Sequence, residues 1–188
     1  MNKFKNKYRI ESNRLQGYDY SQPGAYFITI CTKDRLNLFG KIIDGKMLLN
    51  ECGKIVKECL YDLPNHYNNL SIDESIIMPN HIHTILFIVE TGLRPVSTKI
   101  DNVETVETGL RPVSTEIDNH FNHGVSEFIR ALKSFSTRRI NEKSTTLSSI
   151  IWQRNYYDHI IRNEKELNLI RQYIINNPLQ WVDDEYYS

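Results

Sequence analysis

Two histidines, His81 and His83, lie two residues apart in the most hydrophobic run of the chain, residues 76–89. The run is dense in β-branched and aliphatic residues, which is typical of a buried strand. Side chains two apart on a strand point to the same face, so both imidazoles would project side by side, as binding of one divalent metal ion requires. The alternative is a pair of buried histidines hydrogen-bonded to neighbouring carbonyls. The His81-Ile82-His83 triplet alone leaves both interpretations open.

A tyrosine near the carboxyl end could supply a nucleophile for such a site. Asn163 and Glu166 have the spacing of a capping box, which predicts a helix over about residues 164–176. Tyr173 and Asn177 are four apart and would share one face of that helix. If this face meets the histidines, imidazoles and an amide oxygen can hold a metal while the tyrosine attacks a phosphate. A tyrosine on an amphipathic helix is more commonly a core residue, so this alternative stays open for Tyr173.

The elements that must position these residues follow from hydrophobic spacing and turn signals. A loop is expected over residues 62–69, and Asn50 and Ser126 are the candidate N-caps of two helices. The predicted elements are a strand over 24–32, a hairpin of 39–43 and 46–49 around Asp44 and Gly45, a helix over 50–60, two strands over 71–78 and 81–89 joined at Pro79, and a helix over 125–140.

Length and composition favour one domain of a cytoplasmic protein. The chain has 188 residues, enough for a sizeable core. It contains no apolar run long enough to span a bilayer and no secretory signal, so no membrane partner is expected. Cys31, Cys52 and Cys59 lack the paired spacing of a zinc site and are interpreted as reduced thiols.

The formal net charge is zero, but the basic residues are clustered. One cluster occupies the first 14 residues and another the predicted helix over 125–140 with its continuation to Lys143. A solvated helix face is the ordinary explanation for each cluster. Two clusters in one small domain also suit a surface that follows a phosphate backbone.

A ten-residue sequence occurs twice, at residues 89–98 and 106–115. Two copies are too few for a solenoid, which needs at least three stacked repeats. Their Gly, Pro, Ser, Thr and Glu content suits an excursion from the domain. We therefore expect a single domain over residues 1–188, carrying an insertion at about 90–123 that is disordered and has no core role.

Four blocks in order resemble a known family, the single-tyrosine HUH transposases. Within it they are most similar to the REP-associated tyrosine transposases, relatives of the insertion-sequence transposases that move single-stranded DNA. The resemblance runs from about Arg14 to Trp181, interrupted by the repeated segment. Its blocks are residues 17–29 (GYDYSQPGAYFIT), 78–83 (MPNHIH), 152–162 (WQRNYYDHIIR) and 173–178 (YIINNP).

The resemblance implies an α/β fold: a ferredoxin-like or RRM-like antiparallel sheet with helices packed on one face. It implies that His81 and His83 bind Mg²⁺ or Mn²⁺, with Asn177 as the third protein ligand and Tyr173 as the nucleophile. Two further tyrosines, Tyr156 and Tyr157, are rival nucleophiles by residue type but have no helix-face pairing with a ligand. His159, in the same block, has no predicted role.

It further implies cleavage and rejoining of single-stranded DNA at REP-like hairpins through a 5′-phosphotyrosine intermediate, in transposition or a domesticated equivalent. The expected protein is a monomer or homodimer in the bacterial cytoplasm, associated with the nucleoid. One alternative is a hairpin-binding protein without catalysis. Another is an RRM-like RNA-binding domain or metal phosphoesterase, in which Tyr26 and Phe27 would stack on bases.

Overall fold

The computed structural model describes residues 15, 17–90, 123–143 and 150–187. Apart from its end residues Glu90 and His123, the predicted insertion lies outside the described residues. Its expected disorder therefore remains a prediction.

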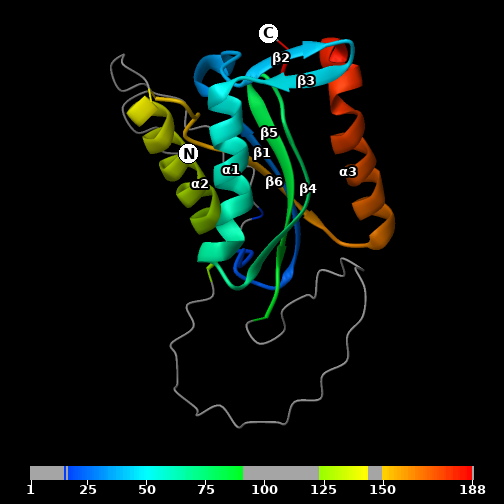
Figure 1. Cartoon of the computed structure of the whole chain (residues 1–188). Coiled ribbons are helices and arrows are strands. Elements are labelled where there is room, and N and C mark those ends of the chain that lie inside the picture. The colour runs from blue at the N-terminus through cyan, green and yellow to red at the C-terminus, as the bar shows by residue number, and fades with distance from the viewer. Residues whose placement is uncertain (1–14, 16, 91–122, 144–149, 188) are drawn as a thin grey trace, which may run out of the picture.

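A four-stranded antiparallel sheet forms the centre of the molecule, with the strand order β4-β5-β1-β6 (Figure 1). This order, with a helix in each of the connections β1 to β4 and β5 to β6, confirms the expected ferredoxin-like α/β fold. A separate hairpin, β2 and β3, confirms the turn predicted at Asp44 and Gly45. The strands are β1 (Gly24–Cys31), β2 (Gly40–Ile43), β3 (Lys46–Leu49), β4 (Leu70–Ile77), β5 (His81–Ile88) and β6 (Tyr157–Ile161).

Three α-helices accompany the sheet: α1 (Glu51–His66), α2 (Val125–Lys143) and α3 (Glu164–Asn176). Two short 3₁₀ helices, η2 (Lys33–Arg35) and η3 (Asn177–Asp183), complete the described secondary structure. Among the described residues, no helix combines the length and the apolar character needed to cross a membrane.

The predicted helix starts are correct where a side chain makes the cap. The Asn50 and Asn163 side chains accept hydrogen bonds from the backbone N–H groups of Gly53 and Glu166, at 3.0 Å and 2.9 Å. The prediction of Ser126 as an N-cap is wrong. Helix α2 begins one residue before it, and the carbonyl of Gly124 accepts the first hydrogen bonds of the helix instead.

The predicted loop over residues 62–69 begins too early. Helix α1 continues to His66, with Pro64 inside its last turn. Leu60 and Leu63 are both buried in the main core, so the apolar stripe of the helix extends past the point where the proline suggested an end. Packing of this stripe outweighs the backbone hydrogen bond that Pro64 cannot make.

Side-chain alternation gives the sheet two different faces. Helices α1 and α2 cover one face, where Tyr26, Ile28 and Leu86 join the larger core. Helix α3 lies across the sheet from them (Figure 1), over a smaller cluster that contains Phe27 and Ile85. The expected cover of helices on one face is thus present as α1 and α2, while α3 adds a third helix on the opposite face.

Polar contacts hold α3 against the sheet. Arg171 donates from Nε and Nη2 to the two carboxylate oxygens of Asp73 on β4, at 2.6 Å and 2.9 Å. Near the start of the helix, a hydrogen bond of 2.7 Å joins His159 Nε2 to Glu166 Oε1, and Glu166 also accepts from the backbone N–H of Arg162. These contacts tie α3 to both edge strands of the sheet, β4 and β6.

Candidate functional site

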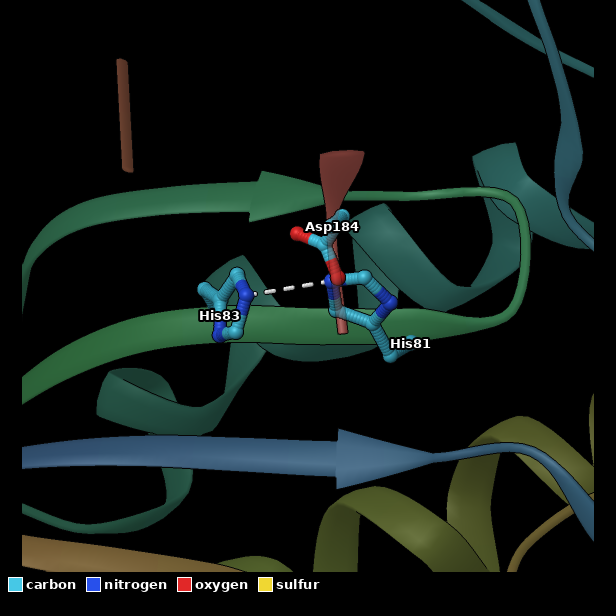
Figure 2. Close-up of side chains that lie close together, drawn as sticks. All are labelled: His81, His83 and Asp184. Atoms are coloured by element: carbon cyan, nitrogen blue, oxygen red, sulfur yellow. Dashed lines mark hydrogen bonds between the residues drawn. The ribbon is translucent and has the colours of Figure 1, made fainter. Parts of the chain in front are cut away.

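His81 and His83 point to the face of β5 that α3 covers, and their side chains converge (Figure 2). The two Nε2 atoms are 3.0 Å apart, and the residues are 0% and 1% exposed. The strand spacing predicted this juxtaposition. Whether the pair holds a metal ion depends on which nitrogen of each ring carries the proton.

The Nδ1 atoms of both rings have polar partners. Asn80 donates from Nδ2 to the carbonyls of Tyr186 and Arg35, so its Oδ1 faces His81 Nδ1 at 2.8 Å and accepts that proton. His81 Nε2 therefore carries a lone pair. The Thr29 hydroxyl lies 2.8 Å from His83 Nδ1 and can accept from it in the same way. In that tautomer both Nε2 lone pairs face the same space, as in a metal-ligating pair. In the other tautomer of His83, its Nε2 donates the 3.0 Å hydrogen bond to His81 Nε2 that Figure 2 draws.

Burial keeps the two imidazoles neutral. It lowers the pKa of His81 from 6.5 to about 4, an effect that Asp184 opposes and Arg35 reinforces. Burial, followed by repulsion from His81, lowers the pKa of His83 well below 6.5. Neutral imidazole is the form that ligates a metal, so both rings are ready to bind one at neutral pH.

Helix α3 brings Tyr173 to the histidines. Its hydroxyl lies 3.2 Å from His83 Nε2, and the centroids of the two rings are 5.1 Å apart. Tyr173 as a whole residue is 36% exposed, so a ligand from solvent can reach it. Burial, and then the charges of Asp184 and Glu185, raise the pKa of Tyr173 to about 12. The phenol is consequently protonated at neutral pH and needs help to act as a nucleophile.

Asn177 is the first residue of η3 and is 1% exposed. It donates from Nδ2 to Asp184 Oδ2 at 2.8 Å. Its Oδ1 is buried and has no hydrogen-bond partner among the described residues. A buried oxygen without a partner is costly, and a cation would satisfy it. The amide oxygen that the sequence predicted as a ligand is thus the unsatisfied atom.

The sequence interpretation missed one acidic residue of this site, Asp184. One ligand atom each from His81, His83 and Asp184 can be chosen so that all lie within 4.8 Å of one another (Figure 2). Two imidazoles and a carboxylate suit a divalent ion of mixed nitrogen and oxygen preference. The acidic run at residues 183–185 is visible in the sequence, but no motif or spacing in the sequence links it to the histidines. The residues present therefore fit a metal ion.

The rival tyrosines are placed differently from Tyr173. The Tyr156 hydroxyl lies 3.4 Å from the Ser126 hydroxyl, and its ring packs against the core on the α1 and α2 face. Tyr157 reaches the α3 face, but within the described part of the chain no hydrogen bond joins either tyrosine to the histidine pair. His159, which had no predicted role, lies beside Glu166 at the start of α3.

The aromatic residues considered for an RRM-like binding surface are mostly covered. Tyr26 is 0% exposed and points into the core beneath α1 and α2. Phe27 is 9% exposed and lies under α3 beside His83, with ring centroids 5.3 Å apart. The open sheet face that an RRM uses for base stacking is not available at these two residues.

Known proteins are similar to this chain in fold or in sequence. A solved structure described as a REP-associated tyrosine transposase bound to a REP hairpin superposes with a TM-score of 0.55 and 19% identity, covering 89% of this chain and 73% of that one. At this identity the likeness shows the fold alone. The model of the family described as "Transposase IS200 like" matches residues 114–177, a range that contains Tyr173 and Asn177.

Two proteins of Haemophilus influenzae are similar along most of their length. One, described as an uncharacterized protein, is 38% identical over 176 residues, which is 94% of this chain and 92% of the relative. The other, named "Putative REP-associated tyrosine transposase", is 25% identical over 162 residues, covering 86% of this chain and 74% of its own. Residues 114–177, about a third of the chain, thus match the IS200-like transposases, and the chain along most of its length is similar to a putative REP-associated tyrosine transposase.

Proposed function

We propose that this protein is a transposase that cuts and rejoins single-stranded DNA beside hairpins of the REP type, with Tyr173 as the nucleophile. The observation that carries the proposal is the 3.2 Å contact between the Tyr173 hydroxyl and His83 Nε2. It puts an accessible phenol at the edge of a group of side chains suited to a divalent ion. The relative bound to a REP hairpin supports a DNA hairpin as the partner.

Mg²⁺ or Mn²⁺ is the proposed cofactor, held by His81, His83 and Asp184, with the unsatisfied Oδ1 of Asn177 as a further ligand. When bound, such an ion would neutralise charge on a phosphate and favour the ionised phenol. His83 Nε2 would then be engaged as a ligand and could not serve as the general base. The phenolic proton of Tyr173 would therefore leave to water.

In the proposed reaction, the Tyr173 oxygen attacks the phosphorus of a phosphodiester. The bond from phosphorus to the 3′ oxygen breaks, and that oxygen takes a proton from solvent as a 5′-phosphotyrosine link forms. The free 3′-hydroxyl of the same or another strand can attack this link, which restores the phosphodiester and returns a proton to the tyrosine. The covalent link retains the energy of the broken bond, so no nucleotide cofactor is required.

The test uses end-labelled single strands of palindromic sequences, taken from the DNA on either side of the gene where these occur, with Mg²⁺ or Mn²⁺. A covalent protein–DNA adduct that survives denaturation is expected from the wild-type protein and not from Tyr173→Phe, which removes only the hydroxyl. Binding of the same strands should be unchanged by this substitution. An adduct of equal yield from Tyr173→Phe would assign the chemistry to another residue. Binding without any wild-type adduct would instead support a hairpin-binding protein without catalysis.

A further inference from the structure

A cleft of about 530 Å³ opens beside the tyrosine of α3. Most of its lining is aromatic: Phe27, Tyr157, Tyr173 and Tyr186, together with Thr29, His83 and Glu185. Clefts of roughly 300–1,000 Å³ accommodate small organic molecules, so the volume admits a single nucleobase. The cleft shares Tyr173 and His83 with the proposed catalytic site, and anything bound in it lies next to the reacting group.

The rings of the cleft are arranged around Phe27. Tyr157 stands edge-on to Phe27, with centroids 6.4 Å apart and planes at 70°. Tyr173 also stands edge-on to it, at 6.1 Å and 84°. Tyr157 is 41% exposed, so part of its ring remains free for another planar group. Its position is defined by strand pairing, because Tyr157 is opposite Thr29 in the register of β6 and β1.

We infer that Tyr157 is the stacking surface for the base of the nucleotide directly beside the phosphodiester that Tyr173 attacks. The ligand of the cleft is then a nucleobase of single-stranded DNA, unpaired and turned out of its own stack. This inference rests on the proposed function and gives Tyr157, a rival nucleophile by residue type, a role in binding. Stacking on an aromatic ring is a general means of holding single strands, because every base has a π face.

Among the described residues that line the cleft there is no lysine or arginine to hold a phosphate group. Glu185 is the charged side chain of the lining, and away from the proposed metal ligands a carboxylate disfavours a second phosphate. The same carboxylate can accept a hydrogen bond from an amino group on a base edge. Tyr157 and Tyr173 both flank Phe27, so a base against one ring and its phosphate at the other belong to adjacent parts of one strand.

The experiment combines a protein change with a DNA change. Tyr157→Ala, Tyr157→Phe and Tyr157→Trp are compared with the wild type in the adduct assay, on the same palindromic strands and on strands with one abasic position moved stepwise through the cleavage site. Tyr61→Ala is the matched control, because Tyr61 on α1 is similarly exposed (48%), and it does not line the cleft.

An abasic position adjacent to the cleaved bond should slow adduct formation by the wild type at least about fivefold, the lower end of what one stacked base contributes. Tyr157→Ala should slow the reaction on intact DNA by a similar factor and be insensitive to that abasic position. Tyr157→Phe and Tyr157→Trp should retain both the rate and the sensitivity, and Tyr61→Ala should match the wild type. The ratio of rates on intact and abasic DNA does not depend on the fraction of folded protein.

Three results would overturn the inference. They are a wild-type rate for Tyr157→Ala, a full abasic penalty that persists in Tyr157→Ala, and a Tyr157→Phe variant as slow as Tyr157→Ala. The last would mean that the hydroxyl, and not the ring face, is needed. Absence of any adduct from the wild type on every strand would instead refute the proposed function, and the inference with it.

Discussion

Asn177 donates a hydrogen bond from Nδ2 to the Asp184 carboxylate at 2.8 Å, which joins the end of α3 to the segment that returns over the histidine pair. The second oxygen of Asp184 accepts from the backbone N–H of Tyr186 at 2.7 Å. The carboxylate is thereby oriented beside His81 and His83 by its neighbours in the chain. The helix that carries the tyrosine and the acidic candidate ligand thus form one connected unit.

Replacement of Asp184 tests the carboxylate as a ligand. Asp184→Asn keeps the shape of the side chain but removes its charge, so we expect the affinity for Mn²⁺ to fall at least about tenfold, the loss typical of an altered metal-binding shell. Isothermal titration or Mn²⁺ electron paramagnetic resonance measures this affinity. Asp183→Asn is the matched control, because Asp183 is adjacent and exposed. Equal losses in the two variants would show a general charge effect and count against ligation by Asp184.

The unsatisfied oxygen of Asn177 makes a second prediction. Asn177→Asp would put a carboxylate in contact with that of Asp184, so without metal we expect repulsion to destabilise the fold by about 1–3 kcal/mol. Excess Mn²⁺ should recover more stability in this variant than in the wild type. Thermal unfolding with chelator and with Mn²⁺ measures both effects. A variant that responds to Mn²⁺ no more than wild type would place the oxygen away from the ion.

The histidine pair predicts acid sensitivity of the metal-free protein. His81 has a pKa of about 4 when folded and about 6.5 when unfolded, so between these values the unfolded chain binds more protons. Stability should therefore fall as pH decreases from about 6.5 to 4, by on the order of 3 kcal/mol from His81 alone. Urea unfolding in chelator at several pH values tests this. His81→Gln should reduce the dependence, and a dependence as steep as that of the wild type would contradict the role of His81.

The ion pair between Arg171 and Asp73 predicts a coupling between α3 and the sheet. The pair is bidentate and only partly exposed, so a double-mutant cycle with Arg171→Met and Asp73→Asn should give a coupling energy of about 1 kcal/mol or more in unfolding. Either single variant should also slow adduct formation, because Tyr173 is two residues from Arg171. Strictly additive effects on unfolding would mean that the pair does not anchor the helix.

Local patterns in the sequence were sufficient where a feature depends on neighbours in the chain. Alternation along a strand put His81 and His83 on one face, and the side-chain caps at Asn50 and Asn163 predicted two helix starts correctly. The helix spacing also placed Tyr173 and Asn177 together, although their roles as nucleophile and ligand remain proposals. Where a backbone group makes the cap, as at Gly124, residue type was a poor guide.

Tertiary structure decided the features that depend on distant contacts. Asp184 approaches a strand about a hundred residues earlier only because η3 turns the chain back after α3. The position of α3 on the face opposite α1 and α2 follows from the contact between Arg171 and Asp73 and from a small apolar cluster. Amphipathic spacing shows that a helix has an apolar side. It does not show which surface will cover that side, because this is determined by the free energy of packing the whole chain.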